Sequence, residues 1–326
     1  MTLMADAAPQ AAAPSDAAPR AVTPARHAVY RPPHPVDLIS TVGRLRRGGT
    51  DPTMVIDGPA IWMAFRTAAG IATLQLRAAR GEIRAIAWGP GAGEALDRVP
   101  RLCGADDDPT GFDVSRHPLL ADAARRNPGM RLGRTDRVFD ALACSILEQK
   151  VTTMQAFGAW RRLVSSYGER APGPTPRPLF AAPAPEVWYR IPSWAWHRAG
   201  VQPPQSRTLT AAAMRGPSIE RAVRAAATGE ERDRVLTSLH GIGPWTSAET
   251  RVRALGDPDA VSVGDFHLAH QVGYALTGQR TDDAGMLELL APWKGHRQRV
   301  IRLILASGVS EPRRAPRLAP EDHRRR

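Results

Sequence analysis

Residues 239–249 read LHGIGPWTSAE, and this stretch decides what the second half of the chain is expected to form. Glycines at 241 and 243 flank one apolar residue, a spacing that permits a tight turn with positive φ and leaves the backbone open to a partner. Pro244 suits the first position of a helix, and the apolar residues before the turn have helical spacing. The stretch therefore predicts two helices joined by a short hairpin whose amides face an anion.

Helical spacing extends well beyond this hairpin. It recurs from HPLLADAARR (117–126) to HRQRVIRLILAS (296–307), with no strand pattern between them. Regions unusually rich in polar residues or proline lie at both ends of the part of the chain that is expected to fold. Residues 1–35 are rich in Ala and Pro and predict a disordered tail, and residues 309–326 predict a basic disordered tail. We therefore expect an all-helical domain over residues 111–308.

The segment from 36 to 110 has a different pattern. Short alternating runs are separated by turn sequences such as GGTDP and ARGE, a pattern typical of antiparallel strands. The runs are DLISTVGRL (37–45), AIWMAFRTA (60–68), GIATLQLRA (70–78) and EIRAIAW (82–88). A helix over GEALDRVPRL (93–102) is expected to cover the sheet. The fold class predicted is α+β, a small antiparallel β domain followed by an all-α domain.

The composition of the chain indicates which class of molecule it binds. The formal net charge is +12 and the pI about 11.0, which favours a polyanion such as nucleic acid. Only Lys150 and Lys294 among the 44 basic residues are lysines, so GC-rich codons are an alternative source of the arginine excess. Two cysteines are too few for a disulfide framework or a zinc knuckle. With no membrane span and no signal peptide in the sequence, a reducing cytoplasm, at the nucleoid, is the expected location.

A second motif sharpens the interpretation of the hairpin. The run GDFHL places Asp265 at the start of a predicted helix, 20 residues after Trp245, and the helix SILEQKVT lies upstream. On these three features the chain resembles the helix-hairpin-helix DNA glycosylases, in particular the monofunctional branch that includes 3-methyladenine DNA glycosylase II. The resemblance covers roughly residues 37–308 and implies the same order of domains.

Asp265 is the predicted catalytic residue. Breaking an N-glycosidic bond builds positive charge on the deoxyribose C1′, and a carboxylate in a water-poor site stabilises that charge. The alternative is a helix N-cap worth about 1 kcal/mol, a role compatible with catalysis. Amides of Gly241, Gly243 and Thr246 are expected to bind one phosphate of the DNA.

Trp245 stands where the resemblance places a Schiff-base lysine in bifunctional relatives. An indole is no such nucleophile, so no lyase activity is expected and water is the predicted nucleophile. We expect Trp245 to stack on the extruded base, where a cationic purine gains up to about 2 kcal/mol from the ring. The alternative is a core tryptophan that packs the hairpin.

Other predicted DNA and base contacts depart from the family pattern. Gln149 is expected to touch the orphaned base or the backbone, and Lys150 replaces an apolar residue that fills the gap left by the flipped base. Val151 and Met154 are alternatives for that role. Two positions of the base pocket that are aromatic in 3-methyladenine DNA glycosylase II, the enzyme that typifies this branch, are Glu249 and Leu305 here. This difference indicates a different substrate preference.

The function predicted is excision of alkylated purines from double-stranded DNA by a monomer. A non-catalytic DNA-binding protein and a glycosylase for deaminated or oxidised bases are the alternatives. His267 and His270 lie three apart without a third ligand, so no catalytic metal or cofactor is expected. In some relatives the carbonyls of the hairpin bind a monovalent cation, a point the sequence leaves open here.

Overall fold

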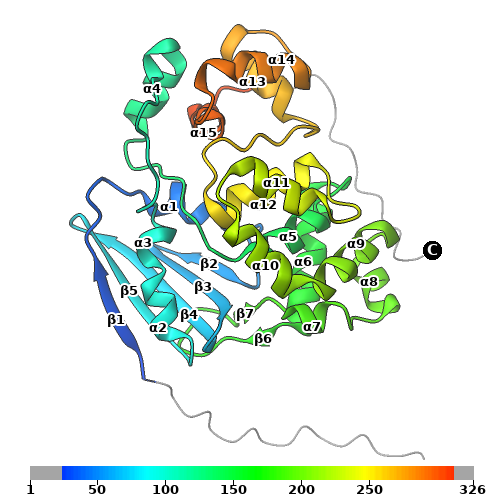
Figure 1. Cartoon of the computed structure of the whole chain (residues 1–326). Helices are drawn as coiled ribbons and strands as arrows, with labels where there is room; N and C mark the ends of the chain where they lie inside the picture. The colour runs from blue at the N-terminus through cyan, green and yellow to red at the C-terminus, as the bar shows by residue number, and fades with distance from the viewer. Residues whose placement is uncertain (1–23, 312–326) are drawn as a thin grey trace, which may run out of the picture.

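The computed structural model describes residues 24–311, in which a five-stranded antiparallel sheet precedes a series of helices (Figure 1). The strand order is β1-β5-β4-β3-β2, so neighbouring strands are joined by short turns except at β1. The strands are β1 (Arg26–Tyr30), β2 (Met54–Asp57), β3 (Ala60–Thr67), β4 (Gly70–Ala79) and β5 (Glu82–Trp88). The predicted α+β class and the antiparallel sheet are confirmed.

Two details of the predicted sheet were wrong. The segment 37–45 is helical, with α1 (Leu38–Thr41) and a 3-10 turn (Gly43–Leu45), because the Asp37 side chain accepts from the Ser40 amide and caps a helix. The first strand instead lies inside the tail predicted to be disordered, since β1 pairs with β5 along its whole length. The rest of that tail, residues 1–23, and residues 312–326 lie outside the described part of the chain.

The two faces of the sheet are covered differently. One face packs its apolar side chains against α1, α2 (Ala92–Asp97) and α3 (Val99–Leu102), as the sequence predicts for residues 93–102. On the other face Trp62 and Trp88 stack with ring centroids 5.4 Å apart. A small ribbon of β6 (Glu169–Arg170) and β7 (Phe180–Ala181), absent from the prediction, closes that face.

The first helical core follows the sheet and holds three tryptophans. Trp188, fully buried, lies 6.2 Å from Trp160 and 5.8 Å from Trp196 between ring centroids. The surrounding helices are α5 (Val138–Leu147), α6 (Thr153–Tyr167), α7 (Pro185–Trp188), α8 (Ser193–Ala199), α9 (Pro203–Met214), α10 (Gly216–Ala225), α11 (Gly229–Thr237) and α12 (Pro244–Leu255). Of these, only α8 was not predicted from helical spacing.

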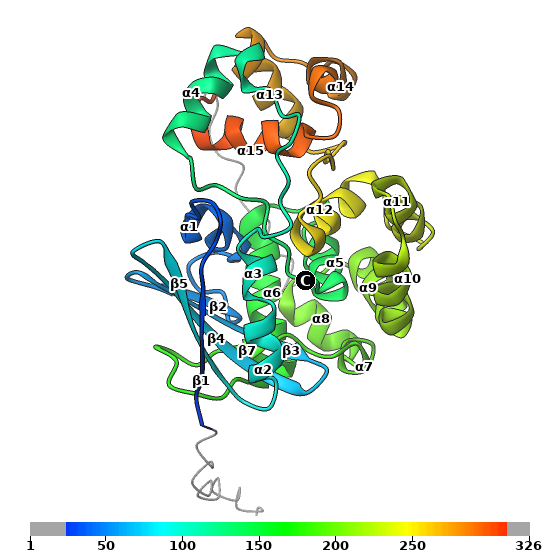
Figure 2. The same ribbon diagram turned by 60° about the vertical axis from the view of Figure 1, so that its left-hand side comes forward.

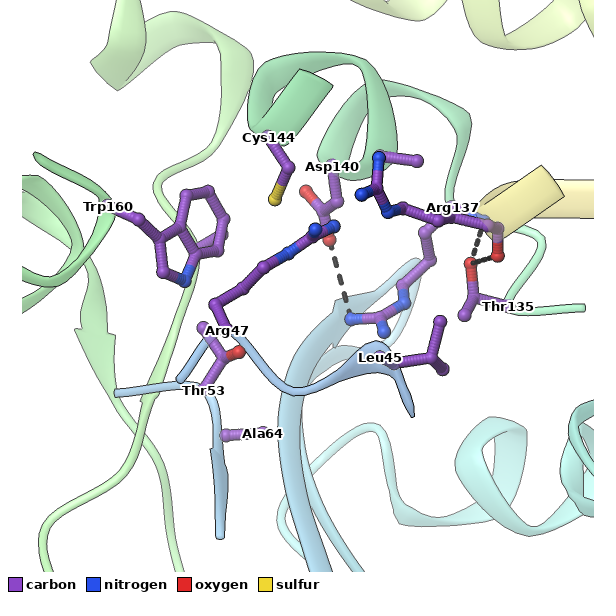
Figure 3. Close-up of a pocket in the computed structure, with 12 residues that line it drawn as sticks. Leu45, Arg47, Thr53, Ala64, Thr135, Arg137, Asp140, Cys144 and Trp160 are labelled. Atoms are coloured by element: carbon purple, nitrogen blue, oxygen red, sulfur yellow. Dashed lines mark hydrogen bonds and ion pairs between the residues drawn. The ribbon is translucent and has the colours of Figure 1, made fainter. Parts of the chain in front are cut away.

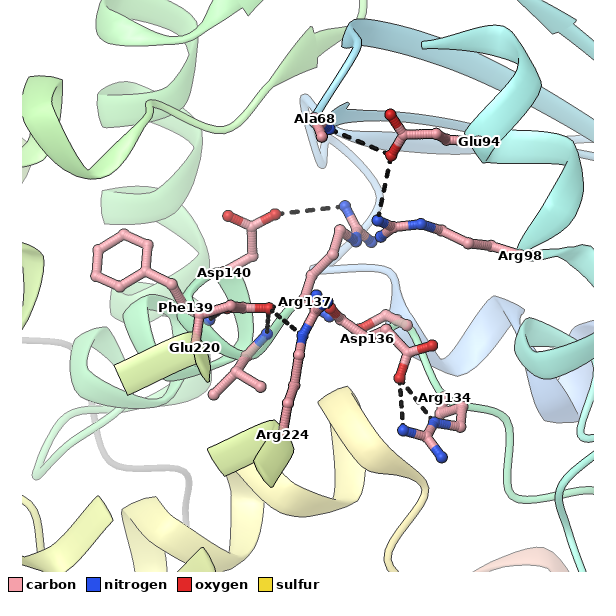
Figure 4. A network of polar contacts seen from close by, with 12 residues as sticks. Ala68, Glu94, Arg98, Arg134, Asp136, Arg137, Phe139, Asp140, Glu220 and Arg224 are labelled. Atoms are coloured by element: carbon pink, nitrogen blue, oxygen red, sulfur yellow. Dashed lines mark hydrogen bonds and ion pairs between the residues drawn. The ribbon is translucent and has the colours of Figure 1, made fainter. Parts of the chain in front are cut away.

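Arg137, just before α5, joins this core to the sheet, because its guanidinium lies 4.5 Å from the centre of the Phe65 ring of β3. Figure 4 shows separate polar contacts around it: Glu94 pairs with Arg98 beside the sheet, and Arg137 pairs with Asp140 of α5. The Glu220 carboxylate accepts from the amides of Val138 and Phe139 at 3.2 and 2.9 Å, and so caps α5, whose own N-cap residue makes no side-chain bond. A helix end that lies under another helix is thereby satisfied.

A second helical core combines the two ends of the region expected to be one helical domain, residues 111–308. It consists of α4 (Pro118–Arg126), α13 (Leu268–Thr277), α14 (Asp283–Leu290) and α15 (Arg297–Ser307). In Figures 1 and 2 these helices gather apart from α5–α12. The segment from 256 to 267 crosses from one core to the other, and it carries Asp265.

Candidate active site

The hairpin between α11 and α12 uses its two glycines differently. Gly241 has a φ of +83°, and a Cβ there would lie 2.2 Å from the Thr208 hydroxyl, so the turn and its packing both require glycine. Gly243 has a φ of −99°, so of the two glycines that permit a tight turn only Gly241 adopts a positive φ. A Cβ on Gly243 would meet nothing within 4 Å. Its backbone is therefore open on the side where we expect a phosphate.

Gln149, just past the end of α5, holds the hairpin. Its amide nitrogen donates to the Gly241 carbonyl at 2.9 Å and to the Thr246 hydroxyl at 2.8 Å. The Thr246 side chain is buried, while its amide belongs to the first turn of α12, where backbone N–H groups have no partner within the helix. Gln149 thus supports the predicted phosphate site from within the protein, a role that the sequence did not indicate.

Lys150 is exposed and has a φ of +53°, an uncommon conformation for a residue with a side chain. It directly follows the anchored Gln149, so its backbone is held beside the hairpin. Val151 is half-buried, whereas Met154 at the start of α6 is 77% exposed. Lys150 and Met154 are therefore the more accessible of the three side chains considered for filling the DNA gap.

Asp265 lies three residues before α13 and is half-buried. One carboxylate oxygen accepts from the amides of His267 and Leu268 at 2.9 and 3.0 Å, and the other accepts from the Trp245 indole N–H at 2.9 Å. The N-cap of α13 is His267, so Asp265 is not the N-cap itself, and its carboxylate instead binds the first amides of the helix from two residues earlier. The bond to Trp245 places the carboxylate next to α12 and the hairpin, between the two helical cores.

Trp245 is also half-buried, in the first turn of α12. Its predicted task is to stack on a base, and the indole N–H is already bound to Asp265. This hydrogen bond uses the ring edge and does not occupy either face of the ring. It adds a second task, since it orients the carboxylate.

Glu249 and Leu305, the two other predicted pocket residues, differ in their surroundings. Glu249 accepts from the Ser262 hydroxyl at 2.6 Å and pairs with Arg253 at 2.7 Å, so both carboxylate oxygens have partners. Leu305 on α15 is 45% exposed. Sequence reasoning passed over Phe266, which follows Asp265 directly, is 76% exposed and meets the His267 ring edge to face at 4.8 Å. An aromatic residue next to the acid was the available signal.

A cavity of about 50 Å³ lies elsewhere, between the sheet and α5 (Figure 3). Arg47, Asp140, Cys144 and Trp160 are among its lining residues, and none of the predicted site residues is. Burial raises the pKa of the Cys144 thiol to about 11, so the thiol stays protonated at neutral pH. Because none of the predicted site residues lines it, this cavity is not the candidate active site.

Within residues 24–311 no three His, Cys, Asp or Glu side chains come together as a metal site requires. His270 is bound through Nδ1 to the Thr281 carbonyl at 2.8 Å. Within the same residues, every helix is too short or too polar to cross a bilayer.

Comparison with known proteins points to one superfamily. No family model matches the chain. It is 28% identical over 176 residues to a probable bifunctional transcriptional activator/DNA repair enzyme AlkA of Mycobacterium tuberculosis, covering 53% of this chain and 35% of the relative. It is 25% identical over 194 residues to the DNA-3-methyladenine glycosylase of Bacillus subtilis, covering 58% and 64%. The chain thus spans between about a third and two thirds of these relatives.

Solved structures share the fold over nearly the whole described chain. The 3-methyladenine DNA-glycosylase of Archaeoglobus fulgidus matches with a TM-score of 0.72 at 17% identity, covering 86% of this chain and 97% of that one. The 8-oxoguanine glycosylase/lyase of Clostridium acetobutylicum matches with 0.68 at 11% identity, covering 88% and 99%.

Fold, hairpin and relatives together indicate one class: the chain is similar to the helix-hairpin-helix DNA glycosylase superfamily. Within that superfamily it is similar to the 3-methyladenine DNA glycosylase II branch, as the hairpin and the Asp265 run predicted.

Proposed function

We propose that the protein is a monofunctional DNA glycosylase that flips alkylated purines, of the 3-methyladenine or 7-methylguanine type, out of duplex DNA and excises them. The position of the Asp265 carboxylate is the observation that supports this proposal most. Its carboxylate is half-buried, lies against α12 through Trp245, and so stands beside the hairpin whose open amides suit a DNA phosphate. The names of the sequence relatives support the alkylated-base class.

The chemistry follows from charge. As the N-glycosidic bond lengthens, the sugar C1′ becomes cationic, and the Asp265 carboxylate stabilises it while the base leaves with the bonding electrons. Water then adds to C1′ and loses a proton, for which the same carboxylate is the acceptor. The products are a free base and an intact abasic site. No metal or cofactor takes part in this scheme.

Monofunctional action is part of the proposal. A lyase step needs an amine that condenses with the sugar aldehyde, and Trp245 holds the position at which bifunctional relatives carry that lysine. Gln149 is hydrogen-bonded to the hairpin and Lys150 follows it directly, so an amine lies near the hairpin. Lyase activity is therefore measured directly. Strand scission without heat or alkali would identify lyase chemistry, and its absence is the expected result.

One observation favours a second candidate, a glycosylase for deaminated or oxidised bases. Glu249 and Leu305 stand where 3-methyladenine DNA glycosylase II, which typifies the branch, has aromatic rings. Neither side chain offers a ring on which a cationic base could stack.

The decisive experiment is a panel of duplexes containing methylated purines, uracil, hypoxanthine or 8-oxoguanine, each incubated with the full chain. Release of methylated bases above the others is expected. Preferential release of a deaminated or oxidised base would replace the substrate class. Release from none of them, with duplex binding retained, would make the protein a non-catalytic DNA-binding member of the superfamily.

A further inference from the structure

A row of alternating charges crosses the molecule beneath Asp265. Arg47, next to the sheet, pairs with Glu148 at the end of α5 at 2.7 Å. The second Glu148 oxygen pairs with Arg253 of α12 at 3.0 Å, and Arg253 pairs with Glu249 one turn earlier at 2.7 Å. Their side chains are only 10% to 21% exposed. Two acids balance two bases, so the row is neutral as a whole.

Ser262 connects this row to the loop of Asp265. Its hydroxyl donates to the free end of the row, the Glu249 carboxylate, at 2.6 Å. Its carbonyl accepts from the Asp265 amide at 3.2 Å, across a tight turn. Ser262 is 3% exposed, so water does not compete well for either bond.

The loop is therefore attached to α12 at two points. Trp245 and Glu249 are four residues apart and lie on one face of that helix. Trp245 holds the carboxylate of Asp265 itself, and Glu249 holds the loop three residues earlier. Two attachments one helical turn apart fix both the distance and the direction of the carboxylate, which a single hydrogen bond does not.

The other end of the row reaches the DNA-binding elements. Glu148 precedes Gln149, whose amide binds the hairpin at Gly241 and Thr246. The hairpin, the segment around Lys150 and the Asp265 loop are thus tied to one set of buried ion pairs.

We infer that Glu249 and Arg253 are positioning residues, which act through Ser262 to hold the Asp265 carboxylate in register with the hairpin that binds DNA. This rests on the proposed function for its catalytic meaning, and it replaces the role of base contact predicted for Glu249. Substrate need not touch either residue. Their loss should lower the rate of excision and leave affinity for duplex DNA unchanged.

The test uses Ser262→Ala, Glu249→Ala and Glu249→Gln, with Ser247→Ala as the matched control. Ser247 lies on the same helix and also donates to a carboxylate, that of Asp233, away from the Asp265 loop. Single-turnover excision should fall about tenfold in Ser262→Ala and further in Glu249→Ala, since a small misplacement of a catalytic group costs this much or more. Glu249→Gln still accepts from Ser262 and should recover most of the rate. Ser247→Ala should match the wild type.

A second readout does not depend on activity. The indole N–H of Trp245, assigned in a ¹H–¹⁵N spectrum by its loss in Trp245→Phe, reports its bond to Asp265. It should shift or broaden in Ser262→Ala and Glu249→Ala and stay in place in Ser247→Ala. Unchanged resonances together with unchanged rates would overturn the inference, as would rate losses matched by equal losses in abasic-duplex affinity.

Failure of the proposed function has a different signature. If Asp265→Asn excises at the wild-type rate, or no base is released from any duplex, the catalytic assignment fails while the indole resonance still tests the positioning. If Asp265→Asn loses activity and Ser262→Ala loses neither rate nor resonance, only the positioning role fails.

Discussion

Within residues 24–311 two tryptophans donate to aspartate carboxylates, in contrasting places. Trp160 donates to Asp51 at 3.2 Å in the region between sheet and helices, and Trp245 donates to Asp265 at 2.9 Å between the two helical cores. Both carboxylates also accept backbone amides, Asp51 from Arg47 and Thr53. Asp51 is 1% exposed, whereas Asp265 is half-buried. The two carboxylates accept hydrogen bonds from similar donors and differ in solvent exposure. Solvent exposure therefore distinguishes the structural carboxylate from the candidate catalytic one.

The largest effects should come from removing the negative charge of the aspartate in each of these two hydrogen bonds. Asp265→Asn should lower single-turnover excision by about 100-fold or more, because a developing cation loses its counter-charge, and should lower the unfolding free energy by no more than about 1 kcal/mol, since the amide oxygen still accepts from the start of the helix. Asp51→Asn should cost about 2 kcal/mol of unfolding free energy, because buried donors lose a charged acceptor, and its folded fraction should excise normally. Equal destabilisation by the two substitutions would remove the distinction.

The hairpin offers the same contrast between its glycines. Gly243→Ala should weaken binding to an abasic duplex about tenfold, because the new methyl group stands where the phosphate approaches, with no change in melting temperature. Gly241→Ala should destabilise the fold by at least about 1–2 kcal/mol, since its φ of +83° is unfavourable with a side chain. Tight DNA binding by Gly243→Ala would argue that the phosphate lies elsewhere.

Each indole can be tested with phenylalanine, which keeps a ring and removes the N–H donor. Trp245→Phe should slow excision about fivefold, the equivalent of one hydrogen bond of roughly 1 kcal/mol, for cationic and neutral bases alike. Trp160→Phe should instead lower the unfolding free energy by about that amount. A loss in Trp245→Phe confined to cationic bases would point to stacking as its main role.

The smallest expected effect tests whether solvent reaches the cavity between the sheet and α5. Cys144 lines the cavity together with Trp160, and burial raises the pKa of its thiol to about 11. About one thiol per thousand is then ionised at pH 8, so labelling by a disulfide reagent should be far slower than in urea. Fast labelling of the native protein would show that solvent enters this region.

Local patterns predicted most of the fold. Helical spacing and the Gly-x-Gly-Pro sequence located α11, α12 and their turn, and alternating runs located β3, β4 and β5. The errors came where tertiary contacts decide. Residues 26–30 carry a weak strand pattern that β5 completes by pairing, and DLISTVGRL alternates like a strand until the Asp37 cap makes it helical.

The resemblance to the glycosylases, and not spacing alone, linked Trp245 of the hairpin with Asp265 of the GDFHL run as candidate site residues. The structure adds connections between the candidate residues that the sequence did not indicate. The bond between Trp245 and Asp265, the anchoring of the hairpin by Gln149 and the tie from Ser262 to Glu249 join residues that are 13 to 97 positions apart. A single sequence contains no signal for such pairs.

The second helical core is assembled from both ends of the helical region. The apolar face of α4 packs with α13–α15, which follow it by more than 140 residues. A chain still emerging from the ribosome therefore holds α4 without its partners until synthesis is nearly finished, while the tryptophan-rich core already has all its helices. The core next to Asp265 is expected to complete last, so a truncated product stopping before residue 265 would lack the acid and leave the apolar face of α4 exposed to aggregation.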